Sequence, residues 1–265
     1  MNISVFTIYK IEIFKLIKRK DWLALLALVA ISLLLGVAVL SKSYKGPINQ
    51  SALFWTSSQI INSTSLFITP MIFAFIGSRI LASEIEDGSI LLYTIRFRNR
   101  MKIYLGKSLA IISFATIAFL MDFIINIAIY YVFVCQNPSI GTGKFLGINT
   151  LSLVIVTLAL YVATFILIAQ FSLFLGAFFK PAAVIGIIFA TALVVMNTTK
   201  VPYFRNLNPM YYVVRINDVV LDKTSQIVVN YSEKLNLFFL LVLLSVIYII
   251  IFNILAVKKL EKSDL

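Results

Sequence analysis

The sequence contains no histidine and a single cysteine, Cys135, among its 265 residues. This inventory excludes a histidine acid/base pair, a histidine-rich metal site and a disulfide within the chain. Acidic residues are also scarce, 11 against 23 lysines and arginines, so the net charge is +12. The basic residues lie in short segments beside apolar runs, where anionic lipid accounts for them, and we therefore expect no nucleic-acid partner.

Long apolar runs dominate what is present. Hydrophobic residues make up 61% of the chain, and the mean hydropathy is +0.99. A helix needs roughly 20 apolar residues to cross a bilayer, and lipid leaves no partner for unpaired backbone groups, so these runs must be helices. We predict an all-α integral membrane protein with a single transmembrane domain, residues 1–265, and six spans at about 22–40, 60–82, 105–134, 150–179, 182–199 and 235–257.

The basic residues are distributed unevenly among the connections. Most of them lie before the first span, between the second and third spans, and at the C-terminus. The positive-inside rule therefore predicts that both termini are cytoplasmic. Within residues 2–20, apolar residues recur at helical spacing against a basic remainder, which predicts an amphipathic helix in contact with membrane lipid at the cytoplasmic interface.

The connection between the second and third spans has acidic, apolar and basic blocks in that order. Glu84, Glu86 and Asp87 precede the apolar residues 89–95, and a basic run follows them. A short apolar helix between charged flanks suits docking into a groove on a soluble partner. The alternative interpretation is an ordinary basic loop that obeys the positive-inside rule.

At this segment the chain resembles the ABC-2 type permeases, the membrane subunits of ABC exporters. Glu84, Gly88, Ser89, Arg100 and Lys107 match the family's pattern, although Phe97 to Arg100 replaces its proline-containing turn. The resemblance implies a cytoplasmic coupling helix between helices 2 and 3 that contacts an ATPase. The residues assigned to this coupling are Glu84, Glu86, Gly88, Leu91, Arg96, Arg98, Arg100 and Lys102.

A second motif, Asn208-Pro209-Met210-Tyr211-Tyr212, is similar to the Asn-Pro-aromatic run before the family's last helix. The resemblance implies an extracytoplasmic helical hairpin between helices 5 and 6, built on Asn208, Pro209, Tyr211 and Tyr212. The alternative is an amphipathic loop whose tyrosines lie in the interfacial aromatic belt.

Asp122 and Asn126 lie four residues apart, on one face of the third span. They either line a substrate path or bond to Asn62, Ser63 or Ser65 of the second span and hold the helices together. The family's second and fifth helices line its pathway, so the resemblance adds Asn62, Thr69, Met196 and Asn197 as candidates.

No phosphate-binding loop of the form G-x-x-x-x-G-K-[ST] occurs in the sequence. We therefore expect no enzyme activity and no cofactor in this chain, with ATP and Mg bound by a separate cytoplasmic ABC ATPase subunit. A second permease copy or a related permease would complete an exporter in the bacterial cytoplasmic membrane. The apolar, aromatic-rich composition favours hydrophobic or amphipathic cargo. The resemblance to permeases of this size implies bacteriocins, lantibiotics, other peptide toxins or hydrophobic drugs, or self-immunity to such peptides. The alternatives are a proton-coupled secondary transporter using Asp122, and a membrane enzyme, for which the acidic residues at 84–87 are the candidate cluster.

Overall fold

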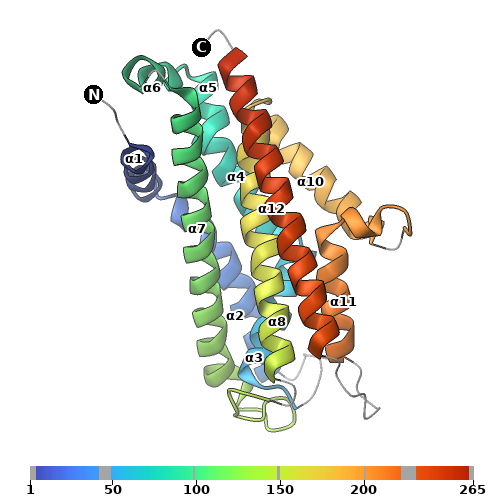
Figure 1. Ribbon diagram of the computed structural model, residues 1–265. Coiled ribbons are helices and arrows are strands. Elements are labelled where there is room, and N and C mark those ends of the chain that lie inside the picture. The colour runs from blue at the N-terminus through green and yellow to red at the C-terminus, as the bar shows by residue number, and fades with distance from the viewer. Residues whose placement is uncertain are drawn as a thin grey trace.

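The computed structural model describes residues 4–41, 49–97, 99–147, 150–199, 201–221 and 231–262 (Figure 1). This part of the chain is helical throughout, and its β pairing is limited to one bridge between Gln50 and Gly141. The elements are, in order, α1 (Val5–Lys18), η1 (Asp21–Leu25), α2 (Leu26–Leu40), α3 (Ala52–Ser65), α4 (Ile68–Gly77), η2 (Ser78–Ala82), α5 (Ser83–Glu86), α6 (Ile90–Phe97), α7 (Arg100–Ile129), η3 (Tyr130–Val134), α8 (Thr150–Leu160), η4 (Tyr161–Ile166), α9 (Leu167–Gly176), α10 (Pro181–Thr198), η5 (Arg205–Leu207), α11 (Pro209–Leu221) and α12 (Tyr231–Lys262).

Among the described residues, six continuous helical stretches are long and apolar enough to cross a membrane: Asp21–Leu40, Ile68–Glu86, Arg100–Val134, Thr150–Gly176, Pro181–Thr198 and Tyr231–Lys262. Three of them include a π-helical turn, at η2, η3 and η4. The predicted number of spans is therefore matched. Their bounds agree with the prediction to within a few residues, with the second span as the clear exception.

The second span was predicted at 60–82, and this placement is wrong at its start. The polar residues Asn62 to Ser65 end a separate helix, α3, and the spanning helix begins only at Ile68. The chain breaks at Leu66 and Phe67, where Phe67 has a φ of 61°. A left-handed residue ends an α-helix, because the backbone can no longer form the next bond of the ladder.

Both termini lie at the same end of the bundle, which we name the α1 end, and the connection 135–147 lies at the opposite end, the far end (Figure 1). The long helices α7 and α12 run between the two ends, whereas α1 lies across their direction beside α7. At the α1 end, α5 and α6 connect the second span to α7. This connection therefore lies next to α1 although some 80 residues separate them in sequence.

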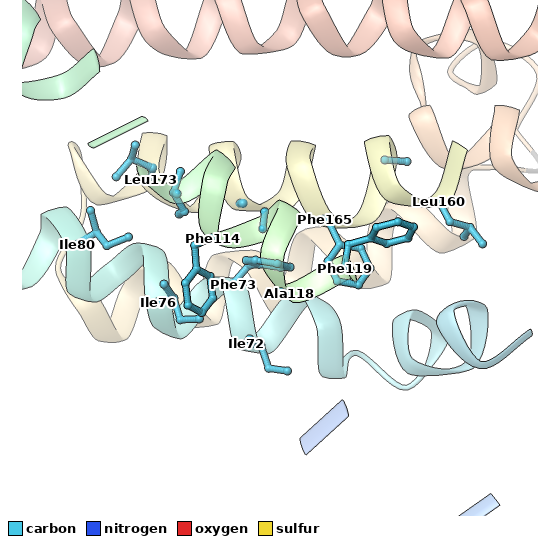
Figure 2. Close-up of a cluster of buried hydrophobic side chains, with 14 of the residues drawn as sticks. Ile72, Phe73, Ile76, Ile80, Phe114, Ala118, Phe119, Leu160, Phe165 and Leu173 are labelled. Atoms are coloured by element: carbon cyan, nitrogen blue, oxygen red, sulfur yellow. The ribbon is translucent and has the colours of Figure 1, made fainter. Parts of the chain in front are cut away.

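The apolar core lies between α4, α7 and the continuous helix α8–η4–α9 (Figure 2). Phe73 of α4 and Phe119 of α7 both contact the ring of Phe165 edge-on, at centroid distances of 5.7 and 5.4 Å. Such aromatic pairs add about 0.5–1.5 kcal/mol beyond the area they bury. These three helices form the rigid frame on which the α1 end is built.

Candidate functional site

A cluster of buried charges lies at the α1 end, where α1, α5, α6 and α7 meet. Its centre is Lys107 of α7, whose side chain is fully buried. The Nζ atom of Lys107 donates hydrogen bonds to Glu84 Oε2 at 2.6 Å and to the carbonyl oxygen of Ile80 at 2.8 Å. It also lies 3.1 Å from Glu12 Oε1 of α1. One ammonium group thus joins three helices that are distant in sequence.

Lys15 and Tyr93 complete the coordination of the two carboxylates. Lys15 Nζ donates to Glu84 Oε1 at 2.7 Å and lies 3.4 Å from Glu12 Oε1. The Tyr93 hydroxyl, on α6, donates to Glu12 Oε1 at 2.7 Å. Two carboxylates and two ammonium groups therefore balance, which buried ions require.

The neighbouring charges decide the ionisation of this cluster. Burial alone raises the pKa of Glu12, but the ammonium groups of Lys107 and Lys15 outweigh it and hold the pKa of Glu12 below its ordinary value. Burial and the Glu12 carboxylate together raise the pKa of Tyr93. The tyrosine hydroxyl therefore stays protonated and remains a donor.

Local sequence explains how these side chains reach one another. Ser4 caps α1 by accepting a hydrogen bond from the backbone N–H of Phe6. Glu12 and Leu16, one turn apart, then lie on the face of α1 that packs on α7. Between α5 and α6 the chain turns at Gly88, whose φ of 71° suits glycine. The turn presents Ile90 and Tyr93 of α6 to the interior.

A second ion pair lies beside this cluster and joins α1, η1 and the second span. Arg79 Nη1 donates to Asp21 Oδ1 at 2.6 Å, and Arg19 Nε lies 3.2 Å from Asp21 Oδ2. Arg19 also donates to the carbonyl oxygen of Arg79 at 3.3 Å. These bonds connect the turn between α1 and α2 to η2.

The predicted coupling residues occupy different environments. Glu84 is buried and points into the cluster, so it holds the segment in place and cannot itself touch a partner. Glu86 is exposed and lies 3.6 Å from Lys180. Arg100 donates to the carbonyl oxygens of Leu260 and Glu261 at the end of α12, and the backbone of Lys102 is capped by Asn99. Arg98 lies outside the described residues, as does the side chain of Arg96.

The outward face of α6 is apolar. Leu91, Leu92 and Ile95 are 41%, 64% and 74% exposed. They are on the exposed side of α6, whereas Tyr93 is buried, and α6 itself lies beside the last turns of α12. This is an exposed apolar surface on a helix that a buried ionic cluster fixes in place, and such a surface marks a contact site for a partner or for lipid.

The predicted pathway residues do not form one site. Asp122 and Asn126 are buried in α7 and bond to each other, with Asn126 Nδ2 donating to Asp122 Oδ1 at 2.9 Å. Among the described residues, neither bonds to Asn62, Ser63 or Ser65, so the interpretation as a bond to the second span is wrong. Thr69 and Ser63 instead bond to each other at 3.1 Å across the break between α3 and α4.

An apolar hollow of about 100 Å³ lies between the α3–α4 break, α9, α10 and the start of α11. Met196 lines it together with Thr64, Pro70, Phe171 and Met210. Asn197, in contrast, is exposed, and its amide donates to the carbonyl oxygen of Leu193 in its own helix. Of the predicted fifth-helix residues, Met196 lines this hollow and Asn197 does not.

The Asn-Pro motif ties the end of α10 to the start of α11, beside the hollow. Asn208 is buried, and its Nδ2 donates to the carbonyl oxygen of Val195 at 2.7 Å and to Thr198 Oγ1 at 3.1 Å. Its Oδ1 accepts a hydrogen bond from the backbone N–H of Met210. α11 is a helix that precedes α12, and residues 222–230, on which the predicted hairpin depends, lie outside the described residues. Pro209 lines the hollow, and the rings of Tyr211 and Tyr212 contact each other edge-on.

Sequence reasoning did not find Glu12, Lys15 or Tyr93. One signal was available: Glu12 is the sole acidic residue among the first 20, between basic residues on both sides. An acid in such a segment indicates a specific ion pair, but its partners on α5 and α7 could not be named from sequence. Gln59 was also missed, since an amide in a serine-rich helix looks like surface.

The charged side chains at the α1 end connect α1, α5, α6 and α7 to one another. Within the described part of the chain, no group of three or more His, Cys, Asp and Glu side chains could hold a metal ion. The charges are paired and buried, and the surface above them is apolar. The ion pairs connect α1, α7 and the second span, and the exposed acid Glu86 lies outside them, 3.6 Å from Lys180.

Comparison with known proteins adds a family. The sequence matches, over residues 24–265, the family model described as a protein of unknown function, DUF2705. No curated protein matches the sequence. The matched region includes all six stretches suited to membrane crossing, though not α1. The chain belongs to the DUF2705 family.

Proposed function

We propose that this chain is the permease subunit of an ATP-driven exporter, with a separate ATPase subunit that binds ATP and Mg and docks on α6. The observation that carries the proposal is the outward apolar face of α6, formed by Leu91, Leu92 and Ile95, beside a cluster in which Lys107 pairs with both Glu12 and Glu84. A helix rigidly linked to α1 and α7 can pass a partner's movement to the membrane helices. A lipid-bound loop needs no such linkage.

In this proposal the α1 end faces the cytoplasm of a bacterial cell membrane, and a second permease copy completes the exporter. Support for the orientation comes from the basic residues of α1 and of α12's last turns. Support for hydrophobic or amphipathic cargo, such as peptides or drugs, comes from the apolar lining of the hollow at Met196 and Met210.

The test is binding and activation of a purified ABC ATPase by this protein in nanodiscs. We expect the wild type to bind the ATPase and to change its rate of ATP hydrolysis. The double variant Leu92→Ser, Ile95→Ser should lose both effects, because it removes the apolar contact without touching the buried cluster. The matched control is Leu243→Ser, an exposed leucine in the middle of α12, which should bind and stimulate as the wild type does.

An ATPase that binds the α6 double variant and the wild type equally would contradict the docking site. If no ABC ATPase from the same cell binds the wild type, the exporter assignment itself fails.

A further inference from the structure

Three buried amide and carboxyl side chains inside the bundle have atoms without partners. Asp122, Asn126 and Gln59 are 3%, 0% and 2% exposed. Asn126 Nδ2 donates to Asp122 Oδ1 at 2.9 Å and to the carbonyl oxygen of Asp122 at 2.8 Å. Within the described part of the chain, Asp122 Oδ2, Asn126 Oδ1 and both polar atoms of the Gln59 amide have no hydrogen-bond partner. Buried polar atoms are nearly always paired, so this group needs a ligand.

The register of α3 on α7 places Gln59 at the level of Asp122 and Asn126. The two helices are antiparallel, and at the far end the Tyr130 hydroxyl donates to the carbonyl oxygen of Gln50 at 2.7 Å. Trp55 of α3 packs in one buried cluster with Tyr130. Gln59 is one helical turn beyond Trp55, and Asn126 is one turn before Tyr130, so both lie at the same level between the helices.

The chemistry of the group selects a small cation. It offers up to three side-chain oxygens, and one of them belongs to a carboxylate. Oxygen ligands suit hard cations. Asp122 is the one acidic residue away from the ends of the six described spans, so a single positive charge neutralises the site. An ionisable residue at such a depth marks an ion site when it faces the bundle interior.

A helix break lies next to the group. Ser63, one turn beyond Gln59, is the last buried serine before α3 ends, and the chain then turns at Phe67. Broken helices inside membrane proteins free backbone carbonyls from the helical ladder and are used to coordinate ions. The break at Phe67 lies about two helical turns beyond Gln59, on the α3 side of the group.

We propose that Asp122, Asn126 and Gln59 form a binding site for one small monovalent cation, with Na⁺ as the probe, between α3 and α7. The site goes beyond the proposed exporter function and does not depend on it, because it needs no ATPase. A bound cation there would fix α3, and with it the α3–α4 break that borders the apolar hollow.

The experiment measures thermal unfolding of the purified chain in nanodiscs, in NaCl against choline chloride at equal ionic strength, together with equilibrium binding of radioactive Na⁺. Ligand binding to the folded state raises the unfolding midpoint in a saturable way. We expect such a rise with Na⁺ and one bound ion per chain. Asp122→Asn should abolish both, and Gln59→Met, which keeps the side-chain volume, should weaken binding about tenfold or more.

The matched control is Ser57→Ala, which removes a buried polar group from the side of α3 that bonds to Thr157 of α8, at 2.7 Å. It should bind Na⁺ as the wild type does. If Asp122→Asn does not fold, the Na⁺ binding of Gln59→Met compared with that of the wild type still tests the proposal. A midpoint equal in NaCl and choline chloride would overturn the proposal, as would a Na⁺ effect that survives in both site variants. A midpoint that responds to pH and not to Na⁺ would show that a proton neutralises Asp122, and would also overturn it.

Discussion

Lys107 offers the sharpest test of the ionic cluster. Its ammonium group lies 2.6 Å from Glu84 and 3.1 Å from Glu12 with no access to solvent. The variant Lys107→Met keeps the length of the side chain and removes the charge, so Lys15 is left to neutralise both buried carboxylates. Breaking a buried ion pair by removing one partner costs about 3–5 kcal/mol. For a chain of this size that loss corresponds to a drop of roughly 6–20 °C in the unfolding midpoint.

A double-mutant cycle separates the charge effect from lost packing. Glu84→Gln in the Lys107→Met background removes the surplus negative charge and leaves Glu12 paired with Lys15. We therefore expect the double variant to be more stable than the sum of the two single losses implies, by about 1–3 kcal/mol. The measurement is reversible unfolding of the purified protein in micelles, with Lys258→Met, an exposed lysine of α12, as the control that should change little. Additive losses, within about 0.5 kcal/mol, would refute the cluster as a coupled unit.

Three further predictions concern other parts of the fold. Because the pKa of Glu12 in the folded state lies below its ordinary value of 4.5, its ionised form stabilises the fold above that pH, and the contribution is lost as the pH falls through the lower folded value. Unfolding measured between about pH 3 and pH 6 should show this acid loss in the wild type and a weaker one in Glu12→Gln. Asn208→Ala removes two hydrogen bonds to α10 and the one that Asn208 accepts from Met210 at the start of α11, and should cost about 1–2 kcal/mol, with faster backbone hydrogen exchange in α11. In Gly77→Ala the new Cβ would lie 2.0 Å from Ser172 Oγ, so unfolding should show a loss of about 1–3 kcal/mol, whereas Gly186→Ala meets nothing within 4 Å and should gain about 0.5–1 kcal/mol.

Each of these three predictions can be contradicted by a specific result. If stability falls equally at low pH in the wild type and in Glu12→Gln, the ionised Glu12 does not stabilise the cluster. Unchanged exchange in α11 after Asn208→Ala would mean that the motif does not hold the two helices together. Equal effects of the two glycine substitutions would contradict the close approach of α4 and α9 at Gly77.

The sequence was sufficient for the membrane helices and insufficient for their contacts. Uncharged runs of about 20 residues can cross a membrane only as helices, so the sequence was enough to predict the number of spans. The error at the second span had a local cause, since hydropathy cannot distinguish one helix from two that are separated by a left-handed residue at Phe67. The structure therefore has six helices suited to crossing a membrane and a separate, mostly buried helix, α3, which carries Gln59.

The candidate site was predictable in its position and not in its partners. The order of charges marked residues 84–102, and α6 forms within that range. Glu84 was expected at the surface, because a charged residue in a loop is usually solvated. Its burial depends on Lys15 and Lys107, which are 69 and 23 residues away. Pairings over such separations are set by the tertiary fold, and no local pattern in the sequence encodes them.

The helix α7 connects the ionic cluster with the buried polar group. α7 carries Lys107 in the ionic cluster and Asp122 in the buried polar group, 15 residues apart and therefore about 22 Å along one axis. Lys107 is bonded to Glu84, which lies on α5 shortly before α6. This ion pair is buried away from water, so it links α6 to α7. Asp122 and Asn126 lie on the same helix against α3 and the break that borders the hollow. If the proposed partner displaces α6, the cost of about 3–5 kcal/mol for breaking the buried ion pair would favour a movement of α7 relative to α3.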